Sequence, residues 1–255
     1  HLLDVADPGA SFSAAEYARL ARGALAGIRE RGRLPIVAGG TGLYLRALLQ
    51  GLFEGPSRDD ALRARLERLA ERFGDARLHR LLERVDPAAA ARIPPRDRVR
   101  VVRALEVFAA TGRPITEGHR AGSAPLQGFL PFVVGLDPGR EALRHAVEER
   151  TRGMLARGLV AETRGLLALG LAEDRGPLAA IGYRQAVALV RGRLSEEAAE
   201  REIVTETMRF AKRQRTWFRH QAEVAWFPGE DAALAAIRAW LDAPGRRAPR
   251  AALTP

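Results

Sequence analysis

Residues 34–44 constrain the fold more than any other part of this 255-residue chain. The segment opens with Ile36 and Val37, which predict a short buried strand, and helical spacing begins at Leu43. Between strand and helix lie Gly39, Gly40, Thr41 and Gly42. Glycine permits positive φ and close backbone approach, so such a turn can direct N–H groups at an anion or serve as a plain connection. The Thr41 hydroxyl can cap the helix or touch a phosphate.

The charge balance favours a polyanionic partner. The chain carries 41 Lys+Arg against 31 Asp+Glu, a formal net charge of +10. That excess is typical of nucleic-acid binding, although abundant Arg and Ala also reflect a GC-rich genome. Cysteine is absent, which excludes disulfides and thiolate metal sites, and no apolar run reaches membrane-spanning length. We therefore expect a cytoplasmic protein that does not associate with a membrane.

Hydrophobic periodicity separates an α/β part of the chain from an all-helical part. Residues 61–110 follow helical spacing throughout, whereas 132–136 and 224–227 are short apolar runs that predict strands. Ser13 and Ser195 each precede acidic residues and predict helix starts. The domain boundaries that follow are an α/β core at 1–51 and 131–242, a helical insertion at 52–130, and a disordered tail at 243–255.

Basic side chains crowd the helix predicted from Ser195 to Gln221. Its expected buried stripe is Ile203, Thr207, Phe210, Gln214 and Trp217, and basic residues cover the remaining surface. So much charge of one sign repels itself unless an anion covers it, so the helix either contacts nucleic acid or presents a solvated basic face. Gln214 needs a partner on the inner stripe, either a base edge or a neighbouring backbone group.

Further arginines gather on the expected helical insertion. Arg100 and Arg103 lie about one helical turn apart, and Arg63 adds charge nearby in sequence. Arg150 lies outside the insertion, on a separate predicted helix. Each of these arginines taken singly is best explained by a surface salt bridge.

Together, these motifs resemble the tRNA dimethylallyltransferase family, also called the tRNA isopentenyltransferases. The resemblance spans nearly the whole chain in the family's order. It is carried by the Gly-Gly-Thr-Gly-Leu-Tyr turn with its helix to residue 51, and by residues 86–93, 100–107, 182–185 and 212–217. Five linked motifs are far more specific than any one of them.

The resemblance implies an α/β fold with a P-loop NTPase-like parallel-sheet core and an inserted all-helical domain that grips the tRNA anticodon arm. It implies transfer of a dimethylallyl group from dimethylallyl diphosphate to the exocyclic amine of the adenosine adjacent to the anticodon, with Mg²⁺. We expect a monomer.

The resemblance also assigns roles to individual residues. Thr41 and Arg150 are the expected catalytic residues, at the catalytic channel and on the diphosphate, and Gly39 and Gly40 form the phosphate turn. The expected tRNA contacts are Arg63, Arg100, Arg103, Arg209, Lys212, Arg213 and Gln214. No residue is assigned to a metal.

The chain departs from the family pattern in one respect. It contains neither the family's Gly-Lys-Ser/Thr phosphate loop nor the Asp-Ser motif of its general base. Both belong upstream of His1, so we expect the N-terminal part of the core to be missing and these 255 residues to be inactive. Two alternatives stay open: an adenylate isopentenyltransferase acting on free nucleotides, which the insertion disfavours, and a non-catalytic tRNA-binding protein without the phosphate loop.

Overall fold

The structure is a computed structural model that describes residues 1–243, apart from residues 11, 54, 57, 121–123 and 175. The chain divides into two compact units, which are described separately. The sheet unit contains residues 1–45 and the chain after residue 126, and the helical unit contains residues 46–126. Within the described ranges, no helix is long and apolar enough to cross a membrane.

A small parallel sheet forms where the two short apolar runs predicted strands. Strand β1 (Val134–Leu136) pairs in parallel with β2 (Ala225–Phe227), with Gly135 opposite Trp226. A Cβ at Gly135 would press into the Trp226 ring, so glycine lets the two strands approach. Helix α12 (Glu230–Asp242) packs beside this pair, and its Trp240 stacks on Phe132 at 5.2 Å.

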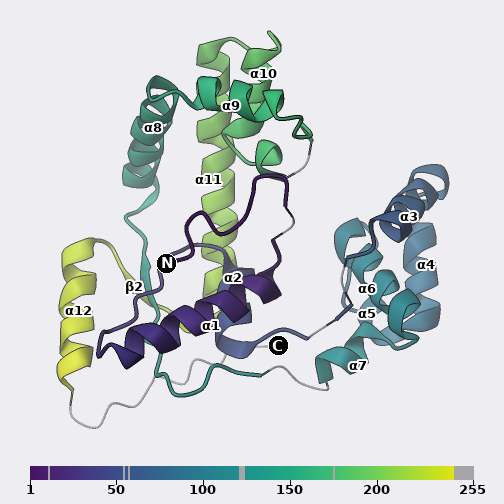
Figure 1. Cartoon of the computed structure of the whole chain (residues 1–255), viewed down its shortest axis with the longest axis horizontal. Coiled ribbons are helices and arrows are strands. Elements are labelled where there is room, and N and C mark those ends of the chain that lie inside the picture. Colours follow the sequence, from purple (N-terminus) through teal and green to yellow (C-terminus); the bar gives the residue numbers. More distant parts are fainter. Residues whose placement is uncertain (11, 54, 57, 121–123, 175, 244–255) are drawn as a thin grey trace. The chain divides into compact units, whose positions relative to one another are not determined.

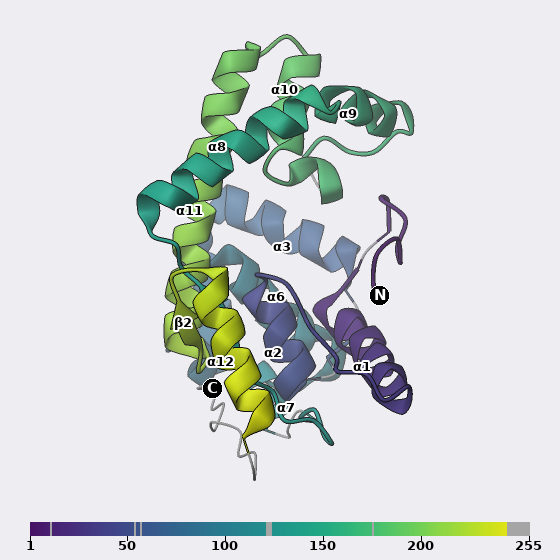
Figure 2. The same ribbon diagram turned by 90° about the vertical axis from the view of Figure 1, so that its left-hand side faces the viewer.

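A cluster of helices packs around α11 (Glu196–Gln221) in the sheet unit (Figures 1 and 2). The cluster comprises α8 (Arg140–Ala156), α9 (Leu159–Ala168) and α10 (Tyr183–Val190), with a 3₁₀ turn at Gly176–Ala179. As predicted, Ser195 caps α11 by accepting the Ala198 N–H. Helices α8 and α10 pack against the N-terminal half of α11, where Ile203 is buried. The C-terminal half of α11 extends beyond these two helices (Figures 1 and 2).

The N-terminal helix also begins at its predicted cap. Helix α1 (Ala14–Glu30) starts after Ser13, whose hydroxyl accepts the Glu16 N–H at 3.1 Å. Helix α2 (Gly42–Gln50) starts directly after the glycine turn and crosses the boundary between the two units.

The prediction of a buried strand before the glycine turn is wrong. Residues 33–41 have no strand pairing, and Ile36 is 81% exposed instead of buried. A strand needs a hydrogen-bonded neighbour, and in the described ranges β1 and β2 pair only with each other. The predicted tail at 243–255 lies outside the described residues except for Ala243.

The helical unit is built as the sequence pattern predicts, from short helices around one apolar core. Its helices are α3 (Asp60–Phe73), α4 (Asp75–Val85), α5 (Pro87–Ala90), α6 (Arg98–Thr111) and α7 (Ile115–Arg120). The core is centred on Leu78, Leu82 and Val101. The buried carboxylate of Asp86 caps α5 through the Ala89 N–H and ties α7 to it through both the N–H and hydroxyl of Thr116. Helix α7 lies beyond the stretch at 61–110 for which the sequence predicted helices.

Candidate functional site

The glycine turn is held from one side by helix α11. The Gln214 side chain donates a hydrogen bond from Nε2 to the Gly40 carbonyl oxygen at 2.7 Å. The Trp217 ring, about one helical turn further on, lies against Gly42. Of the two partners open to Gln214, the structure therefore shows the neighbouring backbone group.

Two of the three glycines in the turn are needed because α11 approaches closely, not because of their backbone conformation. None of Gly39, Gly40 and Gly42 has a positive φ. A Cβ at Gly42 would lie less than 3.0 Å from three carbons of the Trp217 ring, and one at Gly40 would meet Gln214 Nε2 as closely. A Cβ at Gly39 would meet nothing within 4 Å. Gly40 and Gly42 therefore let α11 touch the turn.

Helix α1 contacts the first turn of α2, which follows the glycine turn. Tyr44 stacks on Tyr17 at 4.7 Å between ring centroids, and its hydroxyl donates to the Phe12 carbonyl at 3.5 Å. Burial raises the pKa of Tyr17, with a smaller contribution from Tyr44. Aromatic stacking thus joins the start of α2, directly after the glycine turn, to α1.

Thr41 directly precedes helix α2 and is exposed. Its carbonyl accepts the N–H groups of Tyr44 and Leu45 at 3.0 and 3.1 Å. Its hydroxyl makes no capping hydrogen bond to any described residue. The hydroxyl is thus available to a ligand at the start of the helix.

The C-terminal half of α11 carries an exposed basic face, as predicted. Lys212 and Arg213 are exposed, and Arg209 pairs with Glu206 at 3.4 Å. Phe210 was expected on the buried stripe but is 40% exposed, because α8 and α10 cover only the other half of α11. The Arg213 guanidinium lies over its ring, 5.7 Å from the centroid. This basic face combines cations with an accessible aromatic ring.

Two other arginines of α11 have an internal partner. Arg215 and Arg219 both pair with Asp137, at 3.5 and 3.2 Å. Asp137 directly follows β1, and its N–H donates to the Phe227 carbonyl of β2. These contacts fix the end of α11 to the sheet, so only part of the charge on α11 is open to an external anion.

Arg150 is exposed on helix α8. Val147 and Thr151 on the same helix are buried. Arg150 forms no ion pair with another residue of the described part of the chain. Its guanidinium is therefore open to an external anion.

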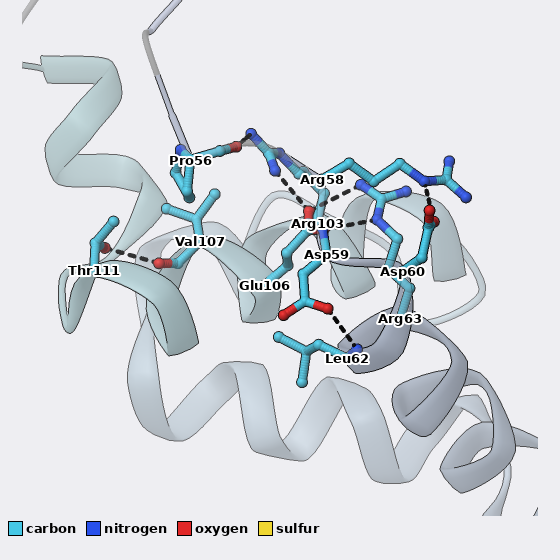
Figure 3. A network of polar contacts seen from close by, with 10 residues as sticks. All are labelled: Pro56, Arg58, Asp59, Asp60, Leu62, Arg63, Arg103, Glu106, Val107 and Thr111. Atoms are coloured by element: carbon cyan, nitrogen blue, oxygen red, sulfur yellow. Dashed lines mark hydrogen bonds and ion pairs between the residues drawn. The ribbon is translucent and has the colours of Figure 1, made fainter. Parts of the chain in front are cut away.

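In the helical unit, a buried carboxylate holds two of the arginines expected on the tRNA path (Figure 3). The Glu106 side chain is 0% exposed. Arg63 grips it with two hydrogen bonds, at 2.8 and 2.9 Å, and Arg103 donates a third at 2.6 Å. The Asp59 N–H adds a fourth, and Arg103 also donates to the Pro56 carbonyl. Arg100 is different, since it is 69% exposed and pairs with Asp97 at 3.2 Å.

These donors determine the protonation of Glu106. Burial disfavours the charged carboxylate, but the hydrogen bonds from Arg63, Arg103 and the Asp59 N–H outweigh it and lower the pKa to about 2. The bonds to Glu106 raise the pKa of Arg63 in turn. At neutral pH, Glu106 is therefore a buried anion fully surrounded by donors.

Known proteins are similar to this chain over most of its length. The IPP transferase family matches residues 1–221. The tRNA dimethylallyltransferase of Koribacter versatilis is 48% identical over 236 residues, covering 92% of this chain and 76% of that protein. The enzyme of the same name from Anaeromyxobacter sp. (strain K) is 48% identical over 89% of this chain and 73% of its own. This chain belongs to the IPP transferase family.

Solved structures agree with that assignment. A tRNA isopentenylpyrophosphate transferase from Bacillus halodurans is 34% identical, with a TM-score of 0.62, over 94% of this chain and 76% of its own. A eukaryotic dimethylallyltransferase acting on tRNA has a TM-score of 0.66 over 86% of this chain and 55% of its own. Its 24% identity supports the fold alone.

Sequence reasoning missed Glu106 in this IPP transferase chain, although a signal was present. Glu106 lies between the apolar residues Leu105 and Val107, three residues after Arg103. A carboxylate inside an apolar helical run needs cations around it, and the nearest candidates were the arginines already singled out. In the described ranges, no cluster of three or more His, Asp or Glu side chains could hold a metal ion.

Glu106 should make the stability of this IPP transferase pH-dependent. Its pKa in the folded chain, about 2, lies below the ordinary 4.5, so its contribution is complete above pH 4.5 and is lost as the pH falls towards 2. Glu106→Gln should cost about 3 kcal/mol at pH 7 and much less at pH 3, because Gln cannot engage both guanidinium groups. Urea unfolding at both pH values measures this.

The matched control is Glu71→Gln, which changes an exposed carboxylate of the same unit. It should shift stability by less than about 0.5 kcal/mol. Equal effects of the two substitutions would contradict the importance of the Glu106 network.

Proposed function

We propose that this chain is a tRNA dimethylallyltransferase. The observation that carries the proposal is the family match over residues 1–221, together with relatives of that name at 48% identity. The substrates are dimethylallyl diphosphate and the anticodon arm of tRNA, and the acceptor is the exocyclic amine of the adenosine adjacent to the anticodon. The protein acts as a monomer in the cytoplasm.

We assign the two units to the two halves of this task. The sheet unit, with its parallel strands β1 and β2, is part of a P-loop NTPase-like core that performs the transfer. The helical unit is the inserted domain that grips the anticodon arm. Its compactness as a unit of its own and its surface arginines support that role.

The sheet unit offers groups suited to the transfer. The amine forms a C–N bond to the dimethylallyl carbon while the C–O bond to the diphosphate breaks, so negative charge builds on the leaving group. Arg150 is an exposed guanidinium that can hold two phosphate oxygens. Thr41 lies at the catalytic channel, next to the phosphate turn at Gly39 and Gly40. The exposed Thr41 hydroxyl supports this placement.

The tRNA path follows the basic residues that remain accessible. Arg209, Lys212 and Arg213 supply cations along α11, and Gln214 lies beside them. Arg100 is the most accessible of the assigned arginines in the helical unit. Arg63 and Arg103 are 19% and 32% exposed, so each presents only its outer edge to a phosphate while holding Glu106.

The family resemblance implies Mg²⁺, but the described residues do not fit a metal site. They contain no cluster of three or more potential ligands among their His, Asp and Glu side chains. Mg²⁺ often binds through substrate phosphates with few protein ligands. We therefore assign no residue of this chain to it and no step of the reaction.

The activity itself is testable with the product of the complete reading frame that encodes these residues. It should transfer the labelled dimethylallyl group to unmodified tRNA, with the label on the adenosine next to the anticodon. Transfer to free AMP but not to tRNA would favour the adenylate enzyme. Binding of tRNA without transfer would favour a non-catalytic tRNA-binding protein.

The 255 residues alone should be inactive in the same assay. They contain no Gly-Lys-Ser/Thr phosphate loop and no Asp-Ser motif for the general base. Turnover by these residues would show that the family's base and phosphate loop have substitutes among them.

Arg100 should contribute one phosphate contact to tRNA binding. Arg100→Ala should lower the slope of log affinity against log salt by about 0.7–0.9, the value for one lost contact. Filter binding at about 50 to 200 mM salt measures this slope. The control Arg80→Ala removes an exposed arginine with no assigned role. An unchanged slope for Arg100→Ala would exclude it from the tRNA path.

Arg150→Ala should reduce kcat and weaken use of dimethylallyl diphosphate while leaving the tRNA Kd unchanged. One charge-assisted bond to a developing anion is worth about 2–4 kcal/mol, or roughly 30- to 1000-fold in rate. Arg150→Lys should restore part of the loss, because Lys lacks the planar fork. Steady-state kinetics varied in each substrate measure both effects.

The control for Arg150 is Arg144→Ala on the same helix, where the arginine pairs with Glu148. It should behave like the unchanged enzyme. Loss of tRNA affinity with normal kcat in Arg150→Ala would place Arg150 on the RNA-binding surface instead.

A further inference from the structure

The C-terminal half of α11 presents two kinds of side chain within six residues. Lys212 and Arg213 are exposed, while Gln214 and Trp217 meet the turn that carries Thr41. We propose that Gln214 and Trp217 are positioning residues that fix Thr41 relative to the basic face of α11. This proposal rests on the proposed function, which makes Thr41 a catalytic residue and α11 a tRNA-binding helix.

The Gln214 contact is chemically directed. A backbone carbonyl accepts hydrogen bonds and donates none, so only the amide nitrogen of Gln214 can bond to Gly40. The two residues are 174 positions apart in the sequence, so this bond is a tertiary contact and not a local turn feature. A carboxylate in the same place would oppose the carbonyl with its own negative charge.

Gln214 holds the turn by a hydrogen bond, whereas Trp217 holds it by steric contact with its rigid ring. Its ring lies so close to Gly42 that any side chain there would displace one or the other. In the first turn of α2, Tyr44 is stacked on Tyr17 of α1. The turn therefore has little freedom to shift without losing contact with one of the two helices.

Contacts of this kind affect rate more than affinity. Neither Gln214 nor Trp217 has to touch the reacting atoms, but both set the position of a segment that does. A shift of about 1 Å in a positioning element can cost roughly 100-fold in rate. The basic residues of α11 stay on the surface after such a shift, so tRNA binding should change little.

The test uses the complete gene product with Gly42→Ala, which places a methyl group against the Trp217 ring. Its kcat should fall roughly 10- to 100-fold at saturating tRNA, with the tRNA Kd within about threefold. Gly42→Ala combined with Trp217→Leu should recover at least about tenfold of the lost kcat, because Leu vacates the space of the ring. No recovery, or a loss confined to tRNA affinity, would overturn the proposal.

The control Gly165→Ala adds a methyl to a helical glycine of α9, where a Cβ meets nothing within 4 Å. It should leave kcat unchanged. A loss as large as that of Gly42→Ala would show that alanine is harmful at glycines in general, and would overturn the steric argument.

Substitutions of Gln214 provide a second test, which does not require that the Gly42→Ala variant folds. Gln214→Glu keeps the size of the side chain but replaces the donor with an acceptor facing the Gly40 carbonyl. It should lower kcat at saturating tRNA more than Gln214→Ala does, since Ala only removes the bond. Equal kcat for Gln214→Glu and the unchanged enzyme would overturn the proposal.

The two hypotheses fail differently. If the unchanged protein transfers no dimethylallyl group to tRNA, the proposed function is wrong. If it is active while Gly42→Ala and Gln214→Glu are equally active, only the positioning role is wrong.

Discussion

The contact between α11 and the glycine turn is the constraint on which the sheet unit depends. One half of α11 is buried against α8 and α10, and the other half carries Gln214 and Trp217 to the turn. Arg215 and Arg219 also tie its end to Asp137 beside the sheet. Helix α11, with its 26 residues, thereby connects helices α8 and α10, the two parallel strands and the start of α2. A helix anchored at both ends transmits position, which a loop in its place would not do.

The helical unit depends on a different interaction, because its interior contains the charged Glu106 carboxylate. An isolated buried carboxylate would be expensive, and Glu106 is stable only because Arg63, Arg103 and the Asp59 N–H surround it. The network joins the segment before α3 to α6, so the same arginines that could attract nucleic acid also organise the unit. Under the proposed function, substituting Arg103 would disturb both folding and tRNA binding, whereas substituting the exposed Arg100 would change tRNA binding alone.

The sequence was sufficient to predict features with a strong local signal. Patterning and capping residues correctly predicted the caps at Ser13 and Ser195, the strands β1 and β2, and helices α3 to α6 of the second unit. Features that depend on distant partners could not be predicted. Ile36 and Val37 have strand-like composition, but pairing needs a neighbour that composition does not reveal. The bond from Gln214 to Gly40 joins residues 174 positions apart, and the burial of Glu106 depends on how α3 meets α6.

Amide hydrogen exchange at the start of α2 tests the central claim most directly. The N–H groups of Tyr44 and Leu45 donate to the Thr41 carbonyl, so their protection reports whether the turn stays in place. If α11 holds the turn, Trp217→Ala should speed exchange at both amides by about tenfold or more while amides in the middle of α1 keep their protection. Unchanged exchange at Tyr44 and Leu45 would show that the turn keeps its position without α11, which would contradict the account.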